Sequence, residues 1–327
     1  MEPPARSREE APLLVDVHVH ILGAGDSDSG IWVSPRYRRS AAWVFLKRRL
    51  GLSGANGPID RAYAEGLVAA VRRSPLKYAV GQGYDGFYDA HGELDRSRTD
   101  FLVPNDYVFR LAREFPELLP AASVNPARRD WSAELEKCAA AGARYVKINP
   151  CTMNLDPGEE RWRPFYRRLA ELGLPLMCHT GPERALRSFG HKLADPARLE
   201  LALSEGLTVI AAHAGTAAFF DRFPFFDHLV RLMARHQRLY ADSSAVAQLL
   251  RWHWMKRLAG HELLRSRLLH GSDYPLPAMA LPWGGMSWRQ WRALPAGPTI
   301  ARDLAIKEAF GIGREAAERA AGVLGIA

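Results

Sequence analysis

The chain has 327 residues, and its composition of 47% hydrophobic and 24% charged residues is typical of a soluble globular protein. No apolar stretch approaches the ~20 residues that cross a bilayer, so we expect neither an integral membrane protein nor a membrane partner. The net charge is +8, but the 44 Lys and Arg residues are spread along the chain without interleaved aromatic stacking motifs, so we expect no nucleic-acid partner.

The N-terminal segment and the cysteines indicate the compartment. Residues 1–12 contain charges and prolines but lack the apolar core of a secretory signal, so we predict a disordered leader there. Cys138, Cys151 and Cys178 form no metal-finger spacing, and an odd count argues against a disulfide framework. We therefore expect a cytoplasmic protein.

Strand and helix patterns alternate along the chain. Eight short, mostly apolar runs are predicted strands, at 13–20, 77–82, 118–124, 145–149, 175–179, 208–213, 239–243 and 268–273. Amphipathic segments of helical length follow them, at 61–73, 105–115, 131–141, 159–172, 196–204, 225–236, 245–259 and 300–324. This alternation predicts an α/β fold, a (β/α)8 TIM barrel formed as one domain by residues 13–327, with a doubly wound open sheet as the alternative.

Two connections are longer than a simple link requires. Residues 22–60 follow the first strand, and residues 276–298 follow the eighth strand and contain Trp283, Trp288 and Trp291. Because both leave the carboxyl ends of strands, we expect them at the rim where barrel active sites lie, as lids or substrate walls. A subunit interface is the alternative, and the tryptophans raise the hypothesis of a homodimer.

The segment Asp16-Val17-His18-Val19-His20 ends the first predicted strand. Side chains at positions i and i+2 share one face of a strand, so His18 and His20 should project side by side. Neutral imidazole is a good ligand for zinc, copper, iron and nickel. Two histidines alone could equally be hydrogen-bonded side chains, so a metal prediction needs further ligands.

Other predicted strands end in polar side chains at the same edge of the barrel. The fourth, fifth, sixth and eighth strands end near Lys147, His179, His213 and Asp273, respectively. The carboxyl ends of barrel strands meet on one face, where residues distant in sequence gather. Burying so many polar groups is costly unless they are hydrogen-bonded or ligate a cation. The sequence therefore predicts a metal centre at this face.

Five segments together resemble the amidohydrolase superfamily. They are DVHVH, VKINP, CHTG, AHAG and HGSDYP, and they occur in this order between residues 16 and 275. The resemblance is strongest to the amidohydrolase-related branch, which contains metal-dependent hydrolases, lactonases and non-oxidative decarboxylases of carboxylated rings. It implies a metal-dependent enzyme with a small-molecule substrate.

The resemblance also implies roles for individual residues. His18, His20 and Asp273 would hold a divalent metal, with His179 as a further ligand. His213 would either ligate a second metal or hydrogen-bond substrate and water, and in the latter case it would steady the developing oxyanion. Asp273 would act as general base on an activated water. The nitrogen-rich set makes zinc the first expectation, with manganese, iron and nickel as alternatives.

Lys147 determines the expected number of metals. In binuclear relatives a lysine that ends the fourth strand reacts with carbon dioxide, and the resulting carbamate bridges two ions. The context Val-Lys-Ile-Asn-Pro resembles those sites. Many members of this branch use one metal, however, and a lysine can also pair with a carboxylate or bind substrate. We favour one ion and keep two as the alternative.

Four further polar residues follow predicted strands and could contact substrate. Tyr84 and Asp85 follow the second strand, and Asn125 follows the third. Arg184 lies soon after the fifth strand and could pair with a substrate carboxylate. A role in turns, or for the arginine a surface position, is the alternative.

The favoured function is hydrolysis of an amide, ester or lactone by a metal-activated water with an aspartate base. The first alternative is non-oxidative decarboxylation, a carbon–carbon lyase reaction in the same barrel. A nuclease of the TatD type is a weaker alternative, because those relatives carry a glutamate at the position of Lys147. A non-catalytic binding barrel is the remaining possibility.

Overall fold

The computed structural model describes residues 12–54, 57–279, 285–297 and 299–326, so the predicted leader at 1–12 lies outside the described residues apart from Pro12. Eight parallel strands form one sheet in the order β1-β3-β5-β6-β7-β8-β9-β10. Their bounds are β1 Val15–His20, β3 Tyr78–Gln82, β5 Leu118–Ser123, β6 Val146–Ile148, β7 Leu176–His179, β8 Val209–Ala212, β9 Leu239–Asp242 and β10 Leu268–Leu269. All eight predicted strands are present, although several end earlier than expected.

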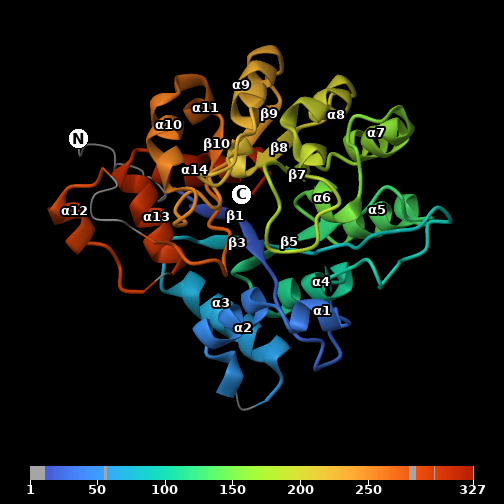
Figure 1. Ribbon diagram of the computed structural model, residues 1–327, viewed down its shortest axis with the longest axis horizontal. Coiled ribbons are helices and arrows are strands. Elements are labelled where there is room, and N and C mark those ends of the chain that lie inside the picture. The colour runs from blue at the N-terminus through green and yellow to red at the C-terminus, as the bar shows by residue number, and fades with distance from the viewer. Residues whose placement is uncertain (1–11, 55–56, 280–284, 298, 327) are drawn as a thin grey trace, which may run out of the picture.

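The first and last strands of the sheet lie side by side and close it into a barrel (Figure 1). The amide nitrogen of Val17 donates to the carbonyl oxygen of His270 at 2.8 Å, and that of His20 donates to Tyr274 at 2.8 Å. These bonds remove the two free edges that an open sheet would have. The predicted TIM barrel is confirmed, and the doubly wound alternative is excluded.

Helices surround the barrel (Figure 1). They are α3 Ile59–Arg72, α4 Asn105–Glu114, α5 Trp131–Ala140, α6 Pro150–Met153, η2 Glu160–Trp162, α7 Arg163–Glu171, η3 His191–Ala194, η4 Pro196–Leu199, α8 Glu200–Ser204, η5 His213–Gly215, α9 Phe225–Arg235, η6 Trp252–Trp254, α10 Met255–Gly260, α11 Glu262–Ser266, α13 Ile300–Ala309 and α14 Arg314–Val323. Within the described part of the chain, no helix has the length and apolar character needed to cross a membrane.

Two of the predicted helices differ from the structure. The predicted helix at 300–324 is divided into α13 and α14, because Gly311 has a left-handed φ of +74° that ends the first helix. The first half of the predicted helix at 245–259 is wrong: residues 244–251 form turns, and helical structure begins only at Trp252. This difference matters because the turns reach the candidate site.

The two long connections are present after β1 and β10, as predicted. The first carries β2 Trp32–Val33, α1 Pro35–Arg38, α2 Ala41–Arg49 and η1 Leu52–Gly54, and β2 pairs antiparallel with β4 Phe101–Leu102. The second carries α12 Trp288–Arg292. Trp288 is exposed and stacks on Trp291, whereas Trp283 lies outside the described residues. The homodimer hypothesis therefore stays a prediction.

A local irregularity in β1 directs its side chains. The register between β1 and β3 shifts between Asp16 and Val19. Val17 packs in the barrel interior, yet His18 directly after it also faces the cavity above that interior. A β-bulge explains how two consecutive side chains can face the same side. Beyond the bulge, Val19 packs against the helices and His20 faces the cavity.

Candidate metal centre

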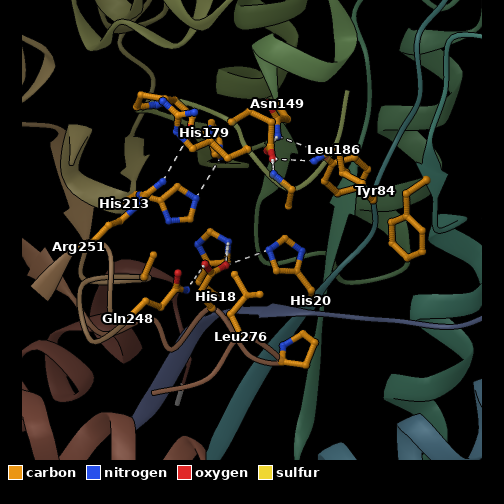
Figure 2. Close-up of a pocket in the computed structure, with 18 of the residues that line it drawn as sticks. His18, His20, Tyr84, Asn149, His179, Leu186, His213, Gln248, Arg251 and Leu276 are labelled. Atoms are coloured by element: carbon orange, nitrogen blue, oxygen red, sulfur yellow. Dashed lines mark hydrogen bonds and ion pairs between the residues drawn. The ribbon is translucent and has the colours of Figure 1, made fainter. Parts of the chain in front are cut away.

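A cavity of about 310 Å³ opens at the carboxyl ends of the strands. Polar side chains at the strand ends, among them His18, His20, His179 and His213, form its floor, and apolar side chains such as Leu186 and Leu276 also line it (Figure 2). Leu22, Tyr37 and Leu46 come from the first long connection, and Leu276 comes from the second. Both connections thus contribute to the walls of the cavity.

Three side chains on the cavity floor bring their polar atoms to the spacing of metal ligands. Nε2 of His20 lies 3.1 Å from Oδ1 of Asp273, and Nε2 of His18 lies 3.5 Å from the same oxygen. In a tetrahedral zinc site with ligand bonds near 2.0–2.1 Å, neighbouring ligand atoms lie about 3.3 Å apart. His18, His20 and Asp273 therefore fit a divalent ion, and the donor set of two imidazoles and one carboxylate is chemically suited to it.

Asp242, at the end of β9, orients the first of these ligands. Its Oδ2 lies 2.7 Å from Nδ1 of His18, and both side chains are buried. An imidazole that donates Nδ1–H to a carboxylate presents its unprotonated Nε2 on the opposite side of the ring, toward Asp273 and His20. Burial alone would raise the pKa of Asp242, but the hydrogen bond and charge of His18 hold it well below its ordinary value.

Asp242 is a residue of this site that was not predicted from the sequence. The predicted strand at 239–243 contains it at its carboxyl end, in the segment Ala241-Asp242-Ser243. A polar side chain at the carboxyl end of a predicted strand, the feature that also marks His179 and His213, is therefore the signal that identifies Asp242.

His213 and His179 form a second group of side chains on the cavity floor (Figure 2). Nε2 of His213 lies 3.1 Å from Nδ1 of His179, and Nδ1 of His213 lies 2.7 Å from the hydroxyl of Ser244. Nε2 of His179 faces the carbonyl oxygen of Gly181 at 3.1 Å. Burial lowers the pKa of both histidines. His179 thus lines the cavity, but its two ring nitrogens face His213 and the Gly181 carbonyl oxygen.

Lys147 lies beside the first ligand. Its Nζ is 3.4 Å from Nε2 of His18, and the side chain is buried. Burial lowers the pKa of Lys147 to about 8, against the favourable charges of Asp242 and Asp273. A substantial fraction of this amine is therefore neutral near physiological pH.

Two of the site residues have strained backbone conformations. His213 has a φ of +64° and Asp273 has a φ of +61°, in the left-handed region that few residues other than glycine adopt. Such conformations cost free energy and concentrate at functional sites. The approach of β10 to β1 is also close: a Cβ added at Gly271 would lie 2.7 Å from Cβ of His18. Only glycine fits there, two residues before Asp273.

On the opposite wall of the cavity, the side chains of Tyr84, Asn149 and Glu183 are joined by hydrogen bonds (Figure 2). Asn149 Nδ2 donates to the Tyr84 hydroxyl at 2.8 Å and to Oε2 of Glu183 at 2.9 Å. The other Glu183 oxygen accepts hydrogen bonds from the amides of Ala185 and Leu186. Asn149 and Glu183 were not selected from the sequence, although Asn149 is part of the quoted segment VKINP.

The remaining candidates for substrate contact occupy different surroundings. Asp85 and Asn125 do not line this cavity; Asp85 Oδ2 accepts from the Asn125 amide at 2.8 Å, and Asn125 Nδ2 donates to the Gly86 carbonyl at 2.9 Å. These bonds join the loops after β3 and β5, which corresponds to the alternative role in turns. Arg184 lines the cavity, but its guanidinium is already paired with Asp221.

Asp16 connects the segments that carry the metal ligands. Its Oδ1 accepts hydrogen bonds from the amides of His18 and Ser272, both at 3.0 Å. Burial raises the pKa of Asp16 to about 6, although the hydrogen bonds from Ser272 and His18 oppose this shift. The folded protein therefore binds this proton more tightly than the unfolded chain does.

This shift predicts the effect of Asp16→Asn on stability. In the wild-type protein, the stabilisation that this proton gives to the folded state is complete below about pH 4 and is lost as the pH rises through about 6. Asparagine keeps an acceptor oxygen but cannot ionise, so the free energy of unfolding of the variant, relative to wild type, should rise by about 2 kcal/mol between pH 4 and pH 7. Urea unfolding of both proteins in chelator measures this difference. If the free energies of unfolding of the two proteins changed in parallel with pH, Asp16 would have the same pKa in the folded and unfolded states.

Comparisons with known proteins identify the family and the fold. A family model described as Amidohydrolase matches residues 15–307. None of the curated proteins matches the sequence. Solved structures with the same fold include an uncharacterized TIM-barrel protein from Bordetella bronchiseptica (TM-score 0.62, 18% identity, covering 95% of this chain and 99% of that chain).

Two further structures of similar fold have described activities. One is a putative 2-pyrone-4,6-dicarboxylic acid hydrolase from Pseudomonas putida (TM-score 0.57, 15% identity, covering 97% of this chain and 99% of that chain). The other is 5-carboxyvanillate decarboxylase from Sphingomonas paucimobilis (TM-score 0.58, 13% identity, covering 97% and 100%). At these identities the similarity shows the fold alone.

Proposed function

Because this chain belongs to the amidohydrolase family, we propose that it is a metal-dependent hydrolase of a small-molecule amide, ester or lactone. The observation that carries the proposal is the group of His18, His20 and Asp273, whose polar atoms have the spacing of ligands around one divalent ion. The nitrogen-rich donor set favours zinc.

A divalent ion bound at this group would lower the pKa of water toward ~7 and polarise a substrate carbonyl. The two oxygens of Asp273 have different surroundings, which permits two roles. Oδ1 faces the histidines, whereas Oδ2 accepts a hydrogen bond from Nε2 of Gln248 at 3.1 Å at the cavity side. Oδ2 would accept the proton from the attacking water and then deliver it to the leaving group.

The neutral histidine pair would assist at the carbonyl oxygen. Burial keeps the pKa of His213 well below its ordinary value, so the ring carries one N–H. Because the Ser244 hydroxyl donates to Asp242, we assign that N–H in the free site to Nδ1, which then donates to the Ser244 oxygen. His213 would stabilise a developing oxyanion in its other tautomer, with the N–H on Nε2 and turned away from His179. In this proposal His213 acts on substrate, and the role of His179 as a further metal ligand is tested by metal content in His179→Ala.

We assign one ion to the site, with Lys147 as a neighbour rather than a ligand. Its partly neutral amine would reduce repulsion toward a cation near His18. The Lys147→Ala variant should therefore retain one ion per chain when analysed by elemental mass spectrometry. Two ions in wild type that fall to one or none in the variant would instead support a carbamate bridge.

Decarboxylation is the second candidate, favoured by the charge of the cavity. Lys147 and Arg251 both line it, and together with an ion they would hold a substrate carboxylate. Product analysis in H₂¹⁸O, with a panel of phenyl esters, lactones and aromatic carboxylates, separates the reactions. Incorporation of ¹⁸O into the acid product supports hydrolysis, whereas release of carbon dioxide with no ¹⁸O in the remaining product would exclude it.

A further inference from the structure

Arg251 lines the cavity, and within the described part of the chain it forms no ion pair with a carboxylate. It lies in the turns after β9, between Gln248 and η6, and it is labelled beside His213 in Figure 2. Its guanidinium makes two long hydrogen bonds of 3.4 Å, to the Thr216 hydroxyl and to the Pro182 carbonyl. Within the described residues, no carboxylate oxygen lies within 4.0 Å of the Arg251 guanidinium nitrogens, the distance that defines an ion pair.

A second arginine of the cavity wall, Arg184, differs from Arg251 because it already has a carboxylate partner. Arg184 also lines the cavity, but Asp221 neutralises its guanidinium through two hydrogen bonds, and its charge lies over the ring of Phe220. An incoming anion would therefore have to displace Asp221 to reach Arg184. Arg251 offers its donors without such competition.

A half-buried guanidinium without an anion is electrostatically unfavourable, because burial disfavours its charge. Burial accordingly lowers the pKa of Arg251, while Asp273 and Glu183 oppose that shift from a distance. Planar N–H donors of this kind match a carboxylate, which accepts two parallel hydrogen bonds. The missing partner is thus best supplied by a ligand.

The rest of the cavity defines the body of such a ligand. Leu46, Leu186, Leu250 and Leu276 line it, together with the ring of Phe101. Apolar walls of this kind bind an apolar body, and a few placed polar groups then fix its orientation. The polar groups here are the metal ligands on the floor and the guanidinium at the side.

We propose that Arg251 is a subsite for a carboxylate of the substrate, distinct from the carbonyl that reacts at the metal ligands. The substrate is then a small acid with an apolar body. This inference rests on the proposed function in taking the cavity as the active site, but binding at Arg251 requires no turnover.

The test compares benzoate with benzamide, two ligands of nearly equal shape that differ in charge. Calorimetric titration of the purified protein, with its metal content measured in each sample, gives the ratio of the two affinities. Arg251→Gln should reduce the preference for benzoate at least tenfold, and Arg251→Lys should retain part of it. Arg222→Gln is the matched control, because Arg222 is exposed in the loop after β8 and does not line the cavity.

The outcomes separate the two proposals. An unchanged benzoate preference in folded Arg251→Gln would overturn the subsite, and so would an equal loss in Arg222→Gln. If purified wild-type protein contained no metal, the hydrolase proposal would be overturned. The ratio of the benzoate and benzamide affinities would still test the role of Arg251. Melting curves of all variants identify a change caused by unfolding.

Discussion

Replacement of Asp273 by asparagine is expected to reduce kcat/KM by 10²–10⁴-fold, the range that a positioned general base contributes. The amide cannot take a proton at the position of Oδ2, and it is a weaker ligand at the position of Oδ1, which now lies 3.1 Å from Nε2 of His20. The measurement is steady-state kinetics on the best substrate from the product panel, with metal content determined in parallel.

A matched control is available on the surface. Asp227 on α9 is exposed and pairs only with Arg257 among the described residues, so Asp227→Asn makes the same chemical change outside the cavity. It should leave kcat/KM unchanged. If Asp273→Asn retained its metal and more than a tenth of wild-type activity, Asp273 would not be the base.

Replacement of Asp242 by asparagine is expected to weaken metal binding by 10–100-fold while leaving the direct ligands in place. Asp242 accepts the Nδ1–H of His18, and its other oxygen accepts from the His213 amide at 2.8 Å and from the Ser244 hydroxyl. Asparagine has only one acceptor oxygen, so it cannot accept both the hydrogen bond from His18 and those from His213 and Ser244. The His18 ring is then held less firmly in the orientation that binds metal.

The affinity follows from competition between the metal-free protein and a chromophoric chelator. Ser244→Ala is a useful comparison, because it removes a partner of Asp242 without touching His18. Its effect on zinc affinity should be smaller. Equal affinity in wild type and Asp242→Asn would show that Asp242 does not orient the ligand.

The sequence predicted the architecture well because parallel strands buried on both faces leave a clear pattern. Each of the eight apolar runs became a strand of the barrel. The same reasoning brought His18, His20 and Asp273 together, since residues at the carboxyl ends of barrel strands must meet at one mouth.

What the sequence could not predict depends on loop conformation. The helical pattern at 245–259 concealed the turns that direct Gln248 and Arg251 into the cavity. Arg184 was the arginine selected for a substrate carboxylate, but its pairing with Asp221 is a contact between two loops with no sequence periodicity. The burial of Asp85 under the loop after β5 arises in the same way.

Elemental analysis of the purified protein tests most directly whether His18, His20 and Asp273 hold a divalent ion. Wild-type protein prepared without chelators and supplied with zinc should contain one ion per chain. The double variant His18→Ala/His20→Ala, shown to be folded by circular dichroism, should contain fewer than about 0.1 ions per chain, given the ligand number that zinc requires. Equal metal content in the two proteins, or none in wild type, would contradict the account.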